Sequence, residues 1–284
     1  RAFIRHVLPI QAASTADAPR HAFGMHLDRA CPAAVESVST PRYQVFMRFI
    51  HPLITGRLLR RYKRFLSDIE LSDGERVVAH CPNPGSMMGL AEPGLAVWLS
   101  PSRNPARKLA FTWELVDAGT SLVGINTGWA NAVVAEAWDQ DRIPELAGYR
   151  AMRREVRYGE RSRIDLLLEA PGRSPCYVEI KSVTLRRDDA RAATPRAEFP
   201  DAVTARGVRH LGELARVVEA GGRAALFYLV QRGDCRRVTI ASDIDPGYAR
   251  AFEHARARGV EVFCYDCRIG PEAIELGQPL PIDG

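Results

Sequence analysis

Three charged side chains lie inside two otherwise apolar segments of this chain. Asp165 is in segment 163–169, and Glu179 and Lys181 are in segment 177–184. Charges in apolar strands are costly unless they pair or bind a metal ion. If the segments form a hairpin, Asp165 faces Glu179, and two converging carboxylates suit Mg²⁺ or Mn²⁺. Lys181 can then assist an attacking water or stabilise a phosphorane charge. A structural ion pair at a sheet end is the alternative interpretation.

A helix that carries an acid precedes these two strands. Asn131 is a typical capping residue, and the helix that follows it contains Glu136 and stops before Pro144. An acid-bearing helix, a strand with Asp, a strand with Glu-x-Lys and a further helix resemble the common core of the PD-(D/E)xK phosphodiesterases. This resemblance implies that Glu136 joins Asp165 and Glu179 in binding a metal ion. Glu136 equally fits the solvated face of a helix.

The later elements alternate between helix and strand. Hydrophobic spacing predicts a long amphipathic helix at about 201–219, a buried strand at 224–230, a helix at 246–258 and a strand at 260–265. With the helix and the two strands described above, this order predicts an α/β domain over residues 127–284.

Arg206 and His210 are neighbours on the predicted helix at 201–219, four residues apart. Such a pair can reach one spot, which a phosphodiesterase would use for a phosphate or the attacking water. The alternative is a partly buried histidine, with Arg206 paired to Glu213 or Asp201.

The region 47–126 consists of short predicted strands separated by turn signals. An Asp-Gly turn and a second turn at 117–119 mark two hairpins. Alternating apolar patterns predict strands at 65–71, 76–80, 96–99, 111–116 and 121–125. Several short strands in so small a region are typical of a small OB-type β-barrel.

Basic side chains in this β-rich region are candidates for contact with a polyanion. Cations alternate with Tyr62 and Phe65, so that phosphates and bases could be contacted together, although a solvated charged face is the alternative. The Pro-rich turn at 80–87 predicts either a backbone nest for a phosphate or a rigid barrel corner. The candidate nucleic-acid-binding residues are Arg60, Arg61, Lys63, Arg64, Asn83, Ser86, Arg107, Lys108, Arg206 and His210.

Composition limits the class of protein. The chain has 284 residues and a formal net charge of +5, which is compatible with a polyanionic partner. No apolar run is long enough to span a bilayer, and six scattered cysteines favour a reducing compartment, so we expect a cytoplasmic protein without a membrane partner. Residues 1–46 are Ala- and Ser-rich without hydrophobic period. We expect them to be a disordered extension or an upstream translation artefact.

Several unusual motifs occur in one order along the chain. They lie at 56–65, 80–87, 162–168, 177–185, 199–204 and Arg206-Gly207. Together they resemble the bacterial and archaeal sugar fermentation stimulation protein A family, with Pro84 where Thr is more usual and Ser182 where Asn is more usual. The match runs from about residue 53 to residue 281.

The resemblance implies a fold and a partner. Members of that family are described as DNA-binding proteins linked to maltose metabolism, with an N-terminal OB-like domain and a C-terminal nuclease-like domain. We therefore expect an OB-like barrel at 47–126, followed by a PD-(D/E)xK nuclease-like α/β domain. Our leading hypothesis is a DNA-binding phosphodiesterase that uses Mg²⁺ or Mn²⁺. A non-catalytic transcriptional regulator and a nucleotide- or sugar-phosphate-binding protein are the alternatives. Strand preference and a homodimeric state stay open.

Overall fold

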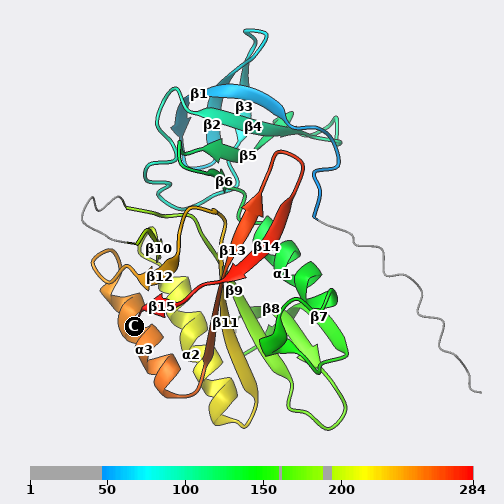
Figure 1. Ribbon diagram of the computed structural model, residues 1–284, viewed down its shortest axis with the longest axis vertical. Coiled ribbons are helices and arrows are strands. Elements are labelled where there is room, and N and C mark those ends of the chain that lie inside the picture. The colour runs from blue at the N-terminus through cyan, green and yellow to red at the C-terminus, as the bar shows by residue number, and fades with distance from the viewer. Residues whose placement is uncertain (1–46, 160–161, 188–193, 284) are drawn as a thin grey trace, which may run out of the picture. The chain divides into compact units, whose positions relative to one another are not determined.

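Residues 47–159, 162–187 and 194–283 are described by the computed structural model in Figure 1. The extension predicted at residues 1–46 lies outside the described residues. No helix within the described ranges is long and apolar enough to cross a membrane.

The first part of the described chain forms a closed β-barrel (Figure 1). β1 pairs with β2 and β4, β2 pairs with β3, β4 pairs with β5, and a short parallel pairing of β3 with β5 closes the barrel. Alternate side chains of β2 are buried, as the sequence pattern predicts. The strands are β1 (Ile54–Tyr62), β2 (Leu66–Leu71), β3 (Arg76–His80), β4 (Ala96–Pro101), β5 (Phe111–Asp117) and β6 (Leu122–Gly124).

A mixed α/β domain follows, built on a six-stranded sheet in the order β14-β13-β11-β9-β8-β7. The central strand β11 is buried along almost its whole length and runs parallel to β9 and β13. The sheet strands are β7 (Ala151–Tyr158), β8 (Ser162–Glu169), β9 (Cys176–Val183), β11 (Arg223–Val230), β13 (Glu261–Ile269) and β14 (Ile274–Pro279). A smaller sheet contains β10 (Arg196–Phe199), β12 (Arg237–Ile240) and β15 (Ile282–Asp283).

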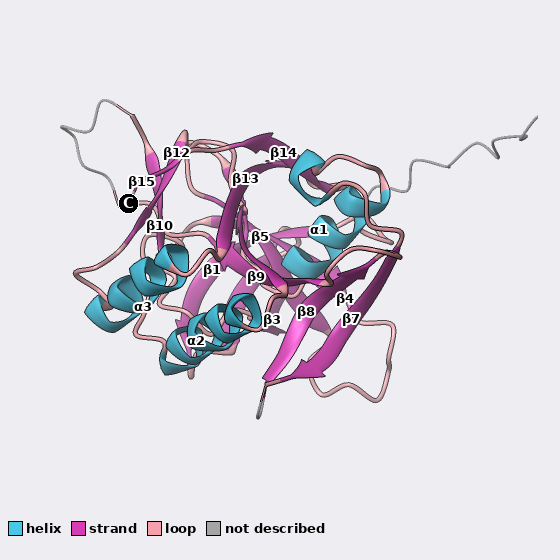
Figure 2. Ribbon diagram, turned by 90° about the horizontal axis from the view of Figure 1, so that it is seen from below, coloured by secondary structure: helices cyan, strands magenta, loops and turns pink. Residues whose placement is uncertain are grey.

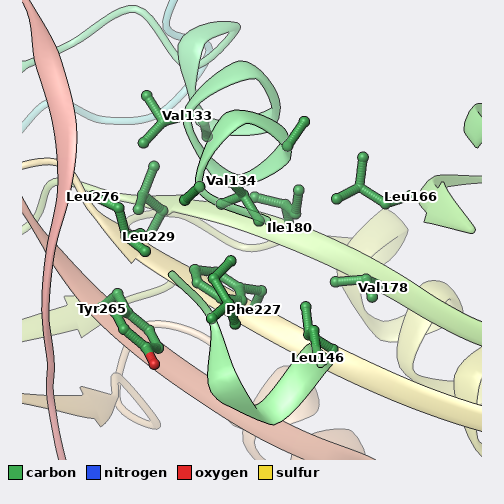
Figure 3. Packing of buried hydrophobic residues seen from close by; sticks show 14 of the residues in the cluster. Val133, Val134, Leu146, Leu166, Val178, Ile180, Phe227, Leu229, Tyr265 and Leu276 are labelled. Carbon is green, nitrogen blue, oxygen red and sulfur yellow. The ribbon is translucent and has the colours of Figure 1, made fainter. Parts of the chain in front are cut away.

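Helices cover both faces of the six-stranded sheet (Figure 2). One face holds α1 (Trp129–Asp139) and the short 3-10 helix η1 (Pro144–Leu146), and the other holds α2 (Ala205–Glu219) and α3 (Pro246–Ala257). Figure 3 shows Val133 and Val134 of α1 packed over the sheet residues Ile180, Phe227 and Leu229. The apolar side chains of β11 alternate between the two cores, so this strand anchors both helical layers.

The predicted order of a small OB-type barrel and an α/β domain is confirmed, and several details are corrected. Gly128, not Asn131, is the N-cap residue of α1, and α2 begins at Ala205 rather than near residue 201. Strands β1, β7, β10, β12, β14 and β15 were not predicted. β7 lies at a sheet edge with mostly exposed side chains, so its sequence lacks the apolar run that marks a buried strand.

Candidate active site

The Asp165 carboxylate is held at the end of the β8–β9 pairing. The two strands are antiparallel, with Leu166 opposite Val178. Just beyond that pair, Asp165 Oδ2 accepts a hydrogen bond of 2.7 Å from the backbone N–H of Ile180. Its Oδ1 accepts another, also 2.7 Å, from the side-chain amide of Asn131 on α1. Two elements on different sides of the carboxylate therefore fix its orientation.

Asp165 has an unusual pKa for an aspartate. Burial and the negative charge of Glu179 together raise its pKa to about 6, against the opposing effect of the hydrogen bonds from Ile180 and Asn131. The electrostatic effect of one acid on the other means that the two carboxylates share one low-dielectric environment. A cation between them would relieve this repulsion.

Glu179 is almost fully buried, with 3% of its surface exposed. Its Oε1 accepts a hydrogen bond of 2.7 Å from Lys181 Nζ and also contacts His210 Nδ1. Burial alone would raise the pKa of Glu179, but the hydrogen bond from His210 and the charge of Lys181 outweigh it and lower the pKa below its ordinary value. The other oxygen, Oε2, is buried and has no hydrogen-bond partner among the residues that the structure describes.

His210 is buried and contacts the Glu179 carboxylate instead of facing solvent. Arg206 Nε donates a hydrogen bond of 3.3 Å to His210 Nε2. Since Nε2 accepts, the proton of the neutral ring lies on Nδ1, from which it is donated to Glu179. His210 is 2% exposed. His210 is therefore a buried helix histidine, as the alternative interpretation proposed. Arg206 contacts this histidine.

A cleft of about 450 Å³ opens in front of these side chains. Asp165, Glu179 and Lys181 line its floor, and Arg206 lies on its wall. Its lining contains residues from both the barrel and the α/β domain: Arg64, Asn83, Pro84, Gly85, Thr127, Ala130, Asn131, Asp165, Glu179, Ile180, Lys181, Ser182, Thr184, Glu198, Phe199, Pro200, Asp201, Ala202, Val203, Thr204, Arg206 and Gly207.

The Pro-rich turn of the barrel reaches this cleft as a rigid loop. Asn83 Oδ1 accepts a hydrogen bond of 2.9 Å from the backbone N–H of Gly85. The guanidinium of Arg61 donates to the backbone carbonyls of Asn83, Gly85 and Ser86. Asp201 packs so closely on this loop that a Cβ at Gly85 would lie 2.1 Å from its carboxylate. The loop is thus braced from both sides.

The basic residues predicted to bind nucleic acid lie in different settings. Arg61 is occupied in bracing the loop, and Arg60 forms an exposed ion pair of 2.6 Å with Asp68. Arg107 donates a hydrogen bond of 2.9 Å to the hydroxyl of Thr112. Exposed residues in the predicted set are Arg60, Lys63, Arg64, Ser86, Arg107, Lys108 and Arg206. Of the barrel cations in that set, Arg64 is the one that lines the cleft.

Glu136 lies away from the other predicted acids. Its Oε2 accepts a hydrogen bond of 2.7 Å from the backbone N–H of Met47, and its pKa is raised by burial and by Glu275 on β14. Five residues separate it from Asn131 on α1, which places the two on different faces of that helix. Asn131 is therefore the α1 residue that contacts Asp165. No pattern in the sequence indicates this contact, because Asn near a helix start is typical of a cap.

The carboxylates of Asp165 and Glu179 are the candidate ligands for a divalent cation. In the part of the chain that the structure describes, no three His, Cys, Asp or Glu side chains are grouped to hold a metal ion. Two carboxylates nevertheless lie beside an open cleft. They are Glu179, whose buried Oε2 is unpaired, and Asp165, whose pKa is raised. A hard cation such as Mg²⁺ commonly takes one or two carboxylates and completes its shell with water and phosphate oxygens. The residues present fit such an ion.

Comparisons with known proteins give a consistent result for sequence and structure. A family model described as "Sugar fermentation stimulation protein RE domain" matches residues 128–273, and an "SfsA N-terminal OB domain" matches residues 59–125. A sugar fermentation stimulation protein homolog from Paramagnetospirillum magneticum is 54% identical over 84% of this chain and 98% of its own length. A homolog from Rhodospirillum rubrum is 53% identical over 83% of this chain and 99% of its own length.

A solved structure resembles the fold. The structure described as Pyrococcus furiosus SfsA in complex with Ca²⁺ superposes with a TM-score of 0.75 and 24% sequence identity. The match covers 84% of this chain and all of that one. At this identity the likeness establishes the shared fold.

Proposed function

This chain belongs to the sugar fermentation stimulation protein (SfsA) family, and on that premise we propose that it binds DNA and hydrolyses its phosphodiester bonds with Mg²⁺ or Mn²⁺. The observation that carries the proposal is the buried, unpaired Oε2 of Glu179 beside Asp165, on the floor of an open cleft. The Pyrococcus furiosus relative was solved with Ca²⁺, which uses the same class of oxygen ligand.

Each side chain at the cleft floor has a distinct task in this proposal. Asp165 and Glu179 would hold the divalent cation, which supplies Lewis-acid activation of the phosphate and of its bound water. Lys181, whose side chain is 13% exposed, directs its ammonium toward the charge that develops on the phosphate. His210 fixes Oε1 of Glu179, which keeps the carboxylate plane from rotating.

The charge of the cleft supports a requirement for the cation in binding as well as in cleavage. Its lining contains four carboxylates, Asp165, Glu179, Glu198 and Asp201, and three cations, Arg64, Lys181 and Arg206. Glu198 is already paired with Arg187, but among the described residues Asp165 and Glu179 have only Lys181 as a charged partner, so an entering phosphate meets negative charge there unless a divalent ion offsets it. Exposed cations of the barrel then supply the phosphate contacts outside the cleft.

A non-catalytic DNA-binding regulator is the second candidate. The position of Glu136 favours it, because the helix acid expected in the PD-(D/E)xK pattern binds the Met47 backbone instead of joining the other two acids. In that case Asp165 and Glu179 would keep a cation that shapes the DNA-binding surface without cleaving the strand.

Cleavage assays with the full chain separate the two candidates. Labelled single- and double-stranded DNA is incubated with Mg²⁺, Mn²⁺ or EDTA, using wild type, Asp165→Asn, Glu179→Gln and Lys181→Met. Glu253→Gln is the matched control, since that exposed acid lies on α3 outside the cleft. We expect metal-dependent cutting that falls by roughly 100-fold or more in the three site variants and is unchanged in the control. Binding without cutting under any metal identifies the regulator instead.

A further inference from the structure

The cleft is closed on one side by a contact between two loops. The backbone N–H of Met87, at the end of the barrel loop, lies 3.4 Å from Asp201 Oδ2. Asp201 also abuts Gly85, where a Cβ would lie 2.1 Å from its carboxylate. Asp201 is therefore in direct contact with Gly85 and Met87. A ligand cannot pass between the barrel loop and the segment 199–204 without separating these residues.

The size of the cleft is that of a small-ligand site. Its volume of about 450 Å³ lies within the range of pockets that enclose drug-sized molecules, which corresponds to roughly one or two nucleotides. The side chains at its floor are recessed, with Glu179 3% exposed. A phosphate must therefore leave the surface and enter the cleft to reach them. In an intact duplex the phosphates lie on the outside of a two-stranded helix, which is too wide to enter a cleft of this volume.

An apolar side chain stands at the mouth of the same cleft. Val203 lines it and is 77% exposed, the most exposed of the large apolar residues in the described chain. Phe65, which follows the cleft residue Arg64 in sequence, is 46% exposed. Unpaired bases offer apolar faces to such side chains, whereas a duplex hides these faces in its stack.

From these three observations we infer that the cleft accepts an unpaired DNA strand and excludes intact duplex. The inference rests on the proposed function and specifies its substrate class. The strand enters past Val203 with its bases against apolar side chains, while its backbone passes between Arg64 and Arg206 toward Asp165 and Glu179.

Binding measurements test this inference with a matched pair of substitutions. Fluorescence anisotropy in Ca²⁺ compares a labelled single strand with a blunt duplex of the same sequence, and a denaturing gel verifies that each stays intact. Val203→Ser is compared with Val78→Ser, because Val78 is an exposed apolar residue of β3 that does not line the cleft. We expect the single strand to bind at least tenfold more tightly than the duplex. Val203→Ser should weaken single-strand binding about fivefold, with Val78→Ser unchanged.

The outcomes distinguish this inference from the proposed function. Equal or tighter binding of blunt duplex, or equal losses in both serine variants, would overturn the preference for an unpaired strand while leaving a DNA-binding protein. If neither form of DNA is bound, and neither is cut in Mg²⁺ or Mn²⁺, the proposed function fails and the inference fails with it. A duplex that is cut only at a single-stranded tail would support the inference.

Discussion

At the scale of single residues, the site depends on how two buried acids are partnered. Glu179 has Lys181 and His210 on one oxygen, so its negative charge is compensated and its pKa is lowered despite burial. Asp165 has only neutral hydrogen-bond donors in direct contact, the Asn131 amide and the Ile180 N–H. Its charge is therefore the less compensated of the two, and Asp165 is the carboxylate that gains most from a bound cation.

This difference predicts a pH dependence of stability. The folded pKa of Asp165, about 6, exceeds the value near 4 of an unfolded aspartate. The protonated form is thus favoured by folding, and the free energy of unfolding should fall by roughly 3 kcal/mol as pH rises from about 4 to about 6. Urea unfolding in EDTA of wild type and Asp165→Asn measures it. A stability difference between the two that does not change over this pH range would contradict the assignment.

At the scale of elements, the loop that follows β3 is placed by a side chain of β1. Arg61 donates to three backbone carbonyls of that loop, whereas its neighbour Arg60 points to Asp68 on the exposed side of the barrel. Adjacent residues of one strand face opposite ways, so one arginine is structural and the other is solvated. A basic run in a sequence does not reveal this division.

The two arginines make a matched pair for mutation. Arg61→Ala leaves carbonyls of the 83–86 turn without their donor, and we expect it to destabilise the fold by about 2 kcal/mol. Arg60→Ala removes an exposed ion pair and should leave stability nearly unchanged. Urea unfolding midpoints of both variants give the comparison. Equal effects of the two substitutions would show that Arg61 does not brace the loop.

Contacts between residues that are close in sequence could be predicted, whereas contacts between residues that are far apart in sequence could not. Alternation in two neighbouring strands was enough to bring Asp165 toward Glu179, because the β8–β9 hairpin is local in sequence. The Asn131 contact spans 34 residues and the Met47–Glu136 contact spans 89, so no periodic pattern records them. The barrel was predictable from turns and alternation, whereas the exposed edge strand β7 was not.

At the scale of the whole molecule, a partly buried ion network joins the barrel to the α/β domain within the described residues. Asp234 accepts hydrogen bonds from Arg232 and Arg186, and also from the hydroxyl of Thr120 in the β5–β6 turn. Burial alone would raise the pKa of Asp234, but hydrogen bonds from Arg232 and Thr120 outweigh it and lower the pKa well below its ordinary range. The network therefore links the β5–β6 turn of the barrel to the α/β domain.

Removing this charge should destabilise the protein in a pH-dependent way. Because the folded pKa of Asp234 is depressed, its contribution is fully present above about pH 4 and is lost as pH falls further. We expect Asp234→Asn to cost about 3 kcal/mol at neutral pH, since two arginines lose their shared partner. Thermal unfolding at neutral and acid pH measures the difference. A loss that persists undiminished in acid would contradict an electrostatic origin.

DNA binding by the whole molecule should also depend on salt. The logarithm of the binding constant is expected to fall linearly with the logarithm of salt concentration, because phosphate contacts release counterions. Arg64→Ala should reduce the slope by about 1, since Arg64 lines the cleft, whereas Arg60→Ala should leave it unchanged because Arg60 is paired with Asp68. A salt-independent affinity in the wild type would rule out phosphate-led recognition.

Anomalous diffraction shows most directly whether Asp165 and Glu179 together bind a divalent cation. Crystals of wild type and Glu179→Gln grown with Mn²⁺ would be compared under the same conditions. We expect one strong anomalous peak between the Asp165 carboxylate and Glu179 Oε2 in the wild type, and its loss in Glu179→Gln. Wild-type crystals saturated with Mn²⁺ that show no peak there, or a peak equally strong in Glu179→Gln, would contradict binding by this pair.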